Sequence, residues 1–170
     1  MMQNWDMICF SLGSNLGDRL GYLQKAFISL SEVFGTPLLI SSVYETDGWG
    51  VEDHPAYLNA AICFNTLMSP EEVLEKILTV EKEYGRIRTA GVIAPRTLDI
   101  DLLFYDDIML KKENLIIPHP LLKYRKFVLL PLAEIMGDYL HPEFGVSINE
   151  LLERCDDHSG ICKTELSLAQ

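Results

Sequence analysis

Two aspartates, Asp99 and Asp101, stand two positions apart in the apolar stretch TLDIDLLFY. In a β-strand such residues share a face with their Cα atoms about 6.7 Å apart, so both carboxylates can converge on one site. Carboxylate oxygens with few other ligands nearby favour Mg²⁺ over Zn²⁺. The alternative is an edge strand with an acidic solvent face. We predict a metal site at this pair.

Arginine is scarce in the chain but concentrated near the aspartates. Only six arginines occur, and Arg86, Arg88 and Arg96 fall in the segment GRIRTAGVIAPR directly before them, with Arg125 downstream. Guanidinium groups bind phosphate oxygens bidentately, so the segment is typical of a mobile loop that clamps a polyphosphate. Solubilising surface arginines are the alternative. The sequence has no glycine-rich phosphate motif, which leaves arginine and metal to bind phosphate.

Four further residues are candidates for ligand binding. Tyr57 and Asn59 share one face of the stretch YLNAAICFNT and suit a flat heterocycle, the ring by stacking and the amide by donating and accepting hydrogen bonds. Glu81 follows the apolar stripe of a predicted helix, where it either binds a ligand or pairs with Lys82 or Arg88. His119 lies between two prolines that favour a rigid turn.

Composition limits the classes of protein that remain. The 170 residues are 48% hydrophobic, as a packed core requires, and the net charge of -11 argues against general nucleic-acid binding. No run of 18 apolar residues and no basic leader occur, so we expect neither a membrane span nor a signal peptide. Cys9 and Cys63 lie in apolar runs and are interpreted as small buried hydrophobes, which fits a reducing cytoplasm.

The elements that must position these residues follow a ferredoxin-like order. We predict strand, helix, strand, strand, helix and strand over residues 6–13, 20–34, 38–46, 57–66, 70–84 and 97–105. This is an α+β fold, with a βαββαβ core whose helices pack on an antiparallel sheet. A hairpin and short helices follow, the last one capped by Ser147 with Glu150. Residues 155–170 are expected to be a frayed tail.

Alternation in the strand over 97–105 predicts two faces. One face should carry Leu98, Ile100, Leu102 and Phe104, and the other Thr97, Asp99, Asp101, Leu103 and Tyr105.

Four segments stand in order along the chain: SLGSNLGDR, YETDGWGVEDHPAYLNA, APRTLDIDLLFY and IPHPLLKYRKFVLLPLAEI. Together they resemble the 6-hydroxymethyl-7,8-dihydropterin pyrophosphokinase family of folate biosynthesis over roughly residues 8–136. The resemblance implies one pyrophosphokinase domain over residues 1–170. It also implies transfer of the β,γ-diphosphate of ATP to the pterin hydroxymethyl oxygen, releasing AMP, with two magnesium ions.

The resemblance also assigns roles to individual residues. Asp99 and Asp101 match the metal ligands, and Arg86 and Arg96 belong to the lid that closes over the reaction. The pterin is matched by Thr46, the backbone of Trp49, Tyr57, Asn59 and Phe127, and ATP by Glu81, Arg86, Arg88, Arg96, His119 and Arg125. The chain departs from many relatives at Ile93, Ala94, Asp47, Gly48 and His54.

Two other classes of protein stay open. Nucleotidyl-transferring and nucleotide-cyclising domains also place paired aspartates on a ferredoxin-like sheet, and a non-catalytic sensor of small molecules can share the topology. The expected partners are ATP and the pterin, without nucleic acid or membrane, and we expect a monomer.

Overall fold

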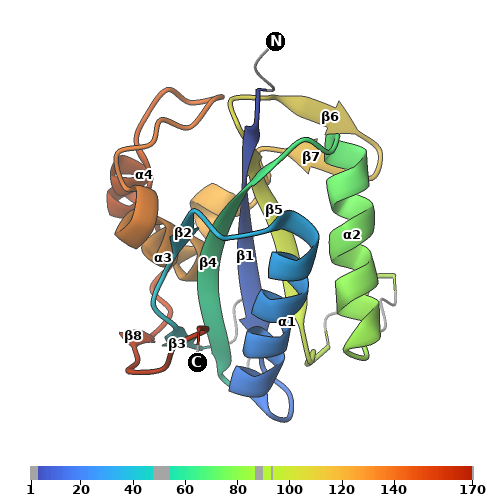
Figure 1. Cartoon of the computed structure of the whole chain (residues 1–170). Helices are drawn as coiled ribbons and strands as arrows, with labels where there is room; N and C mark the ends of the chain where they lie inside the picture. Colours follow the sequence, from blue (N-terminus) through green and yellow to red (C-terminus); the bar gives the residue numbers. More distant parts are fainter. Residues whose placement is uncertain (1–3, 48–53, 87–89, 93, 170) are drawn as a thin grey trace.

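The architecture is an antiparallel sheet with helices on both faces (Figure 1). The computed structural model describes residues 4–47, 54–86, 90–92 and 94–169. The sheet has six strands in the order β5-β1-β4-β3-β8, and β2 also pairs with β4. These are β1 Asp6–Ser14, β2 Leu39–Ile40, β3 Tyr44–Thr46, β4 Tyr57–Thr66, β5 Asp99–Tyr105 and β8 Ile161–Lys163. The predicted α+β fold is confirmed, with the predicted strand at 38–46 divided into β2 and β3.

One face of the sheet is covered by α1 (Arg19–Phe34) and α2 (Pro70–Glu83). Their apolar residues pack on alternate residues of β1, β4 and β5, which form the main core. Side chains of a strand alternate between faces, so the same strands present their other residues to the opposite side. Ser11 and Asp101 belong to that opposite side, together with Asn59.

The second face is covered in part by α3 (Lys126–Met136) and α4 (Ile148–Arg154). A hairpin of β6 (Leu110–Lys112) and β7 (Leu115–Ile117) leads into the short helix η1 (Leu122–Tyr124) and then α3. Because α3 packs across β4, the turn before it holds the His119 and Arg125 region against the polar end of the sheet.

The predicted faces of β5 are wrong at its end. A register shift occurs where β1 passes from Cys9, opposite Phe104, to Phe10, opposite Leu102. The extra residue reverses the alternation, so Phe104 packs with α3 and α4 and Tyr105 joins the core under α1 and α2. The shift lies beyond Asp99 and Asp101, which keep their predicted shared face.

The burial predicted for Cys9 and Cys63 is confirmed, but the two residues are not separate hydrophobic side chains. Both are fully buried, but they lie opposite each other in β1 and β4 and are joined by a disulfide. Direct cross-strand neighbours lie close enough for their side chains to meet. The pairing removes cysteine usage as support for a reducing compartment.

The C-terminal residues are not a frayed tail. Residues Ile161–Lys163 form β8, which pairs with β3 from Tyr44 to Thr46, and Leu168 is buried in the main core. No local periodicity marks a strand of three residues, so this element depends on the edge that β3 offers.

Capping fixes the start of α2, which carries Glu81. The Ser69 hydroxyl accepts a hydrogen bond from the Glu72 amide at 3.3 Å, and Glu72 Oε2 accepts one from the Ser69 amide at 2.7 Å. The capping box predicted from the sequence at Ser147 and Glu150 is likewise present in α4.

We expect Ser69→Ala to lower the free energy of unfolding by about 1 kcal/mol, because one amide of the first turn loses its acceptor. Chemical denaturation measures the loss, and Thr79→Ala on the exposed face of the same helix is the control. An unchanged unfolding midpoint would contradict the role of the cap.

Candidate active site

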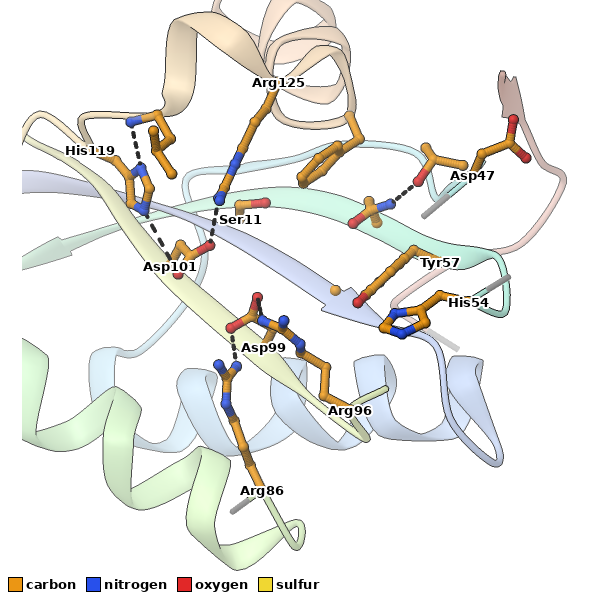
Figure 2. Close-up of a pocket in the computed structure, with 15 residues that line it drawn as sticks. Ser11, Asp47, His54, Tyr57, Arg86, Arg96, Asp99, Asp101, His119 and Arg125 are labelled. Atoms are coloured by element: carbon orange, nitrogen blue, oxygen red, sulfur yellow. Dashed lines mark hydrogen bonds and ion pairs between the residues drawn. The ribbon is translucent and has the colours of Figure 1, made fainter. Parts of the chain in front are cut away.

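A pocket of about 260 Å³ opens on the polar end of the sheet (Figure 2). It contains most of the residues that the sequence pattern singled out, although the lining comes from six separate stretches of the chain: 11–13, 46–47, 54–59, 86, 96–101 and 119–127. Its lining consists of Ser11, Gly13, Thr46, Asp47, His54, Tyr57, Asn59, Arg86, Arg96, Asp99, Asp101, His119, Leu121, Arg125 and Phe127. Glu81 lies beside this lining, and the predicted site residues Trp49 and Arg88 lie outside the described residues.

The register of three strands explains why these side chains meet. In β1, Gly13 lies opposite both Asn59 of β4 and Asp99 of β5, and Ser11 lies opposite Asp101. A Cβ at Gly13 would stand 3.1 Å from Asn59 Oδ1, so a side chain there would crowd the amide. Glycine therefore leaves the centre of the pocket open between the amide and the carboxylates.

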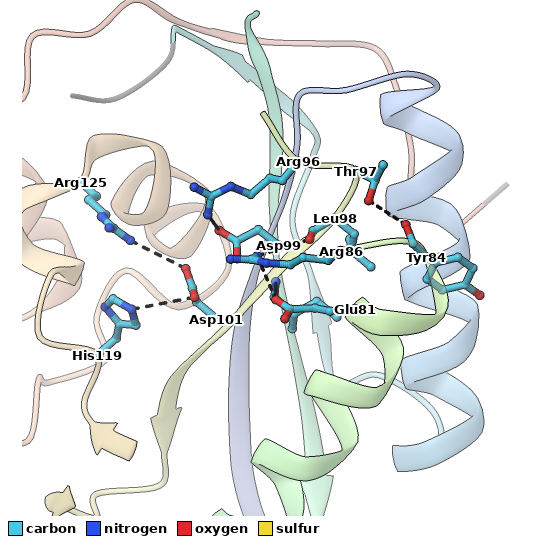
Figure 3. A network of polar contacts seen from close by, with 11 residues as sticks. Glu81, Tyr84, Arg86, Arg96, Thr97, Leu98, Asp99, Asp101, His119 and Arg125 are labelled. Carbon is cyan, nitrogen blue, oxygen red and sulfur yellow. Dashed lines mark hydrogen bonds and ion pairs between the residues drawn. The ribbon is translucent and has the colours of Figure 1, made fainter. Parts of the chain in front are cut away.

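Asp99 is surrounded by guanidinium groups (Figure 3). Arg86 Nη1 donates to Asp99 Oδ1, and Arg96 Nη1 donates to Asp99 Oδ2 at 2.9 Å. These guanidinium groups offset the repulsion between the neighbouring carboxylates of Asp99 and Asp101. The same two arginines are the ones expected to bind phosphate.

Glu81 holds Arg86 in place through a partly buried hydrogen bond. Its side chain is 2% exposed, and Oε1 accepts hydrogen bonds from the Ile100 amide at 2.8 Å and from Arg86 Nη1 at 3.1 Å. Arg86 is thus one partner of Glu81, whereas the predicted partner Arg88 lies outside the described residues. Because a buried carboxylate needs such partners, Glu81 fixes the end of α2 to β5 and orients the guanidinium.

Asp101 faces the opposite side of the pocket. Its carboxylate lies 3.7 Å from Arg125 Nη1 and 4.0 Å from His119 Nε2. Burial, followed by the nearby Asp99, raises the pKa of Asp101 to about 7. Burial and Arg125 lower the pKa of His119 to about 4, so the imidazole is neutral near pH 7. Its Nδ1 accepts a hydrogen bond from the Leu121 amide at 3.2 Å, which orients the ring.

The other end of the pocket carries rings and an amide. Asn59 is 2% exposed and donates to Thr46 Oγ1 at 2.7 Å, which fixes the amide at the pocket wall. Tyr57 shares its face, as predicted, and Phe127 enters from the first turn of α3. The guanidinium carbon of Arg125 lies 5.7 Å from the centre of the Phe127 ring, which links the two ends of the pocket.

Asn15 connects two loops that border the site. The backbone amide of Asn15 donates to the Arg96 carbonyl at 3.1 Å, and its side-chain Oδ1 accepts from the Arg96 backbone amide at 2.7 Å. Its side-chain Nδ2 donates to the Pro55 carbonyl at 3.2 Å. The motif SLGSN contains this residue together with Ser11 and Gly13, none of which the sequence analysis assigned a role. The tight spacing of Gly, Ser and Asn at a strand end was the available signal.

The two aspartates suit a magnesium ion that arrives with phosphate. Mg²⁺ in proteins is commonly bound by one or two carboxylates, with phosphate and water oxygens completing the octahedron. Asp99 and Asp101 share a strand face, and both line the pocket. Among the described residues, no three His, Cys, Asp or Glu side chains gather to hold a metal by themselves, so substrate oxygens would supply the other ligands.

Comparison with known proteins decides the family. The model of 7,8-dihydro-6-hydroxymethylpterin-pyrophosphokinase (HPPK) matches residues 9–137. The chain belongs to this family. It is therefore a diphosphotransferase of folate biosynthesis that uses ATP, and the resemblance drawn from the four sequence segments is confirmed.

Curated relatives agree with the HPPK assignment. A 2-amino-4-hydroxy-6-hydroxymethyldihydropteridine pyrophosphokinase of Synechocystis is 42% identical over 85% of this chain and 74% of its own length. The enzyme of that name from Aquifex aeolicus is 39% identical over 84% of this chain and 88% of its own length.

The fold agrees as well. Plasmodium falciparum HPPK-DHPS in complex with pteroate superposes on 91% of this chain with a TM-score of 0.75 and 15% identity. This chain spans 43% of that larger protein. Among the helices that the structure describes, none has the length and apolar character to cross a membrane.

Proposed function

We propose that this pocket transfers the β,γ-diphosphate of ATP to the hydroxymethyl oxygen of 6-hydroxymethyl-7,8-dihydropterin and releases AMP. The observation that carries the proposal is the division of one cavity into two ends. Carboxylates and arginines gather at one end, and two aromatic rings with a buried amide stand at the other. A reaction that joins a polyphosphate to a flat heterocycle needs both ends.

At the phosphate end, Arg86 and Arg96 would exchange Asp99 for phosphate oxygens as ATP and metal bind. Both guanidinium groups already point at the carboxylate that would hold the metal. Arg125 and His119 would contact phosphate from the opposite side, next to Asp101. Two bound magnesium ions would neutralise phosphate charge and lower the pKa of the attacking hydroxyl.

Little covalent chemistry is required of the protein in such a transfer. Positioning the hydroxyl in line with the β-phosphorus and neutralising charge on the transferred group supply most of the acceleration. The arginines are placed for that purpose because guanidinium groups offer fixed pairs of donors. The oxygen–phosphorus bond to the pterin forms as the bond between the α,β-bridging oxygen and the β-phosphorus breaks. The electron pair leaves with AMP, and the proton of the attacking hydroxyl is released to solvent.

At the pterin end, Tyr57 and Phe127 would stack on opposite faces of the heterocycle. Asn59 and Thr46 would bind its polar edge, because their mutual hydrogen bond fixes the position of polar atoms in a buried part of the pocket wall. We keep Glu81 and Arg88 as predicted ATP residues and the Trp49 backbone as a predicted pterin contact. A single domain over residues 1–170 and a monomeric state remain part of the proposal. So does a cytoplasmic location, since ATP is an intracellular substrate.

Turnover of the whole chain tests this function. Incubation with ATP, Mg²⁺ and 6-hydroxymethyl-7,8-dihydropterin should release AMP in step with a pterin diphosphate, and chelation of Mg²⁺ should stop the reaction. Inorganic pyrophosphate with a nucleotide product would instead indicate a nucleotidyl transferase. Binding of both ligands without any product would indicate a sensor.

We expect the pterin slot to respond to three substitutions in different ways. Tyr57→Ala and Phe127→Ala should each weaken pterin binding at least severalfold, because a stacked ring contributes about 0.5 to 1.5 kcal/mol beyond its buried area. Asn59→Ala should cost roughly 1 to 3 kcal/mol by leaving a buried polar edge without its partner. Titration of the pterin in the presence of Mg²⁺ and a non-hydrolysable ATP analogue measures these losses.

The exposed Tyr124 provides a matched control, since Tyr124→Ala removes a ring that lies outside the pocket. Circular dichroism confirms that each variant folds. Unchanged pterin affinity in both aromatic variants would place the slot elsewhere.

A further inference from the structure

A short segment near the C-terminus, residues 157–160, connects two walls of the pocket. One wall is the start of α3, which carries Phe127, and the other is the end of β3, which carries Thr46 and leads into Asp47. The segment itself does not line the pocket. It also lies outside residues 9–137, the part of the chain that the HPPK family model covers.

On the side of α3, Asp157 binds the first residue of the helix. The Lys126 amide donates to Asp157 Oδ2 at 3.0 Å. Amides in the first turn of a helix have no acceptor within the helix, and the positive end of its dipole favours a carboxylate. Since Phe127 is the next residue after Lys126, this bond fixes the backbone from which the ring enters the pocket.

Asp157 is itself held in one orientation. Its Oδ1 accepts hydrogen bonds from the Ser159 amide at 2.9 Å and the Ser159 hydroxyl at 2.5 Å. Burial alone would raise the pKa of Asp157, but the hydrogen bonds from Ser159 and Lys126 bring it below its usual value. The group therefore stays ionised as a firm acceptor.

On the side of β3, Gly160 and Asp47 are bonded in both directions. The Asp47 amide donates to the Gly160 carbonyl at 3.1 Å, and the Gly160 amide donates to Asp47 Oδ2 at 3.0 Å. The pairing continues into β8, where Ile161 lies opposite Thr46. A Cβ at position 160 would come within 2.7 Å of Asp47 Oδ2, so glycine permits this close approach.

We propose that residues 157–160 form a brace that sets the spacing between Phe127 and the Thr46–Asp47 edge, and thereby the fit of the flat heterocycle. Asp157 and Gly160 are positioning residues, because they act through the walls and do not touch the ligand. The inference rests on the proposed function, since it assigns the pterin to the space between these walls.

The test compares pterin affinity with nucleotide affinity in the full chain. In Asp157→Ala and in Gly160→Ala, we expect the Kd of the pterin, with Mg²⁺ and a non-hydrolysable ATP analogue bound, to rise about threefold to tenfold. In Gly160→Ala, the Kd of the ATP analogue should stay within about twofold of wild type, because Gly160 bonds to Asp47 and none of the residues assigned to ATP lies on that wall. Asp157→Ala also releases the residue next to Arg125, an assigned ATP residue, so only its pterin Kd tests the brace. Asp157→Asn keeps an acceptor for Lys126 and should recover part of the loss.

Asp156→Ala is the matched control, because the Asp156 side chain is 98% exposed and pairs with the exposed His158. Equal pterin affinity in wild type, Asp157→Ala and Gly160→Ala would overturn the brace, as would equal loss of affinity for both ligands in Gly160→Ala. If Asp157→Ala does not fold, the pterin affinity of Gly160→Ala alone tests the brace, because this substitution adds only one methyl group. A wild-type chain that neither binds nor converts the pterin would contradict the proposed function itself. Failure of the brace is seen only by comparing variants with an active wild type, so the two outcomes can be told apart.

Discussion

Asp99→Asn and Asp101→Asn should each lower kcat by at least about 100-fold, since a metal that neutralises phosphate charge is worth several kcal/mol in the transition state. Asparagine keeps the size of the side chain but removes the anionic oxygen that Mg²⁺ prefers. Both residues lie in β5, whose pairing with β1 does not depend on their charge, so the fold should persist. Steady-state kinetics at saturating Mg²⁺ measures the loss.

The matched control is Asp107→Asn, which changes an exposed aspartate just beyond the same strand. The raised pKa of Asp101, about 7, adds a pH dependence. Since the metal binds the carboxylate and competes with the proton, affinity for Mg²⁺ should rise as the pH increases through 7. Near-normal turnover in either asparagine variant would contradict the metal assignment.

Arg86→Ala and Arg96→Ala should lower kcat by about 100-fold or more, because a fixed donor aimed at developing charge contributes mainly in the transition state. Binding of ATP in the ground state should weaken much less. The geometry supports this expectation: Glu81 holds Arg86, and the backbone of Arg96 is held by Asn15, so both donors are oriented before substrate arrives.

A split between kcat and the Kd of ATP is the measurement that matters here. Arg154→Ala is the control, since Arg154 is an exposed arginine on α4 that lies outside the pocket. If both lid variants changed only the Kd of ATP, these arginines would anchor the substrate without acting on the transition state.

Local patterns predicted most of the elements and the strand faces of several pocket residues. The shared face of Asp99 and Asp101 follows from the period of a strand. The start of α2 at Ser69 follows from a capping box that involves only neighbouring residues. The shared face of Tyr57 and Asn59 likewise follows from alternation in β4. Each of these features depends on a few consecutive residues.

Features that depend on pairing between distant segments were missed. The disulfide of Cys9 and Cys63 requires the register of β1 and β4, and the reversed faces of Phe104 and Tyr105 require the shift between β1 and β5. The strand β8 forms because β3 offers it an edge. Alternation along one strand contains none of this information.

The most direct test of the central claim follows each phosphorus of ATP into the products of the wild-type reaction. With ATP labelled in turn at the α-, β- and γ-phosphorus, transfer of an intact diphosphate predicts that the β- and γ-labels appear on the pterin and the α-label in AMP. A γ-label alone on the pterin would indicate simple phosphoryl transfer. An α-label on the pterin would indicate nucleotidyl transfer, and either result would contradict the proposed reaction.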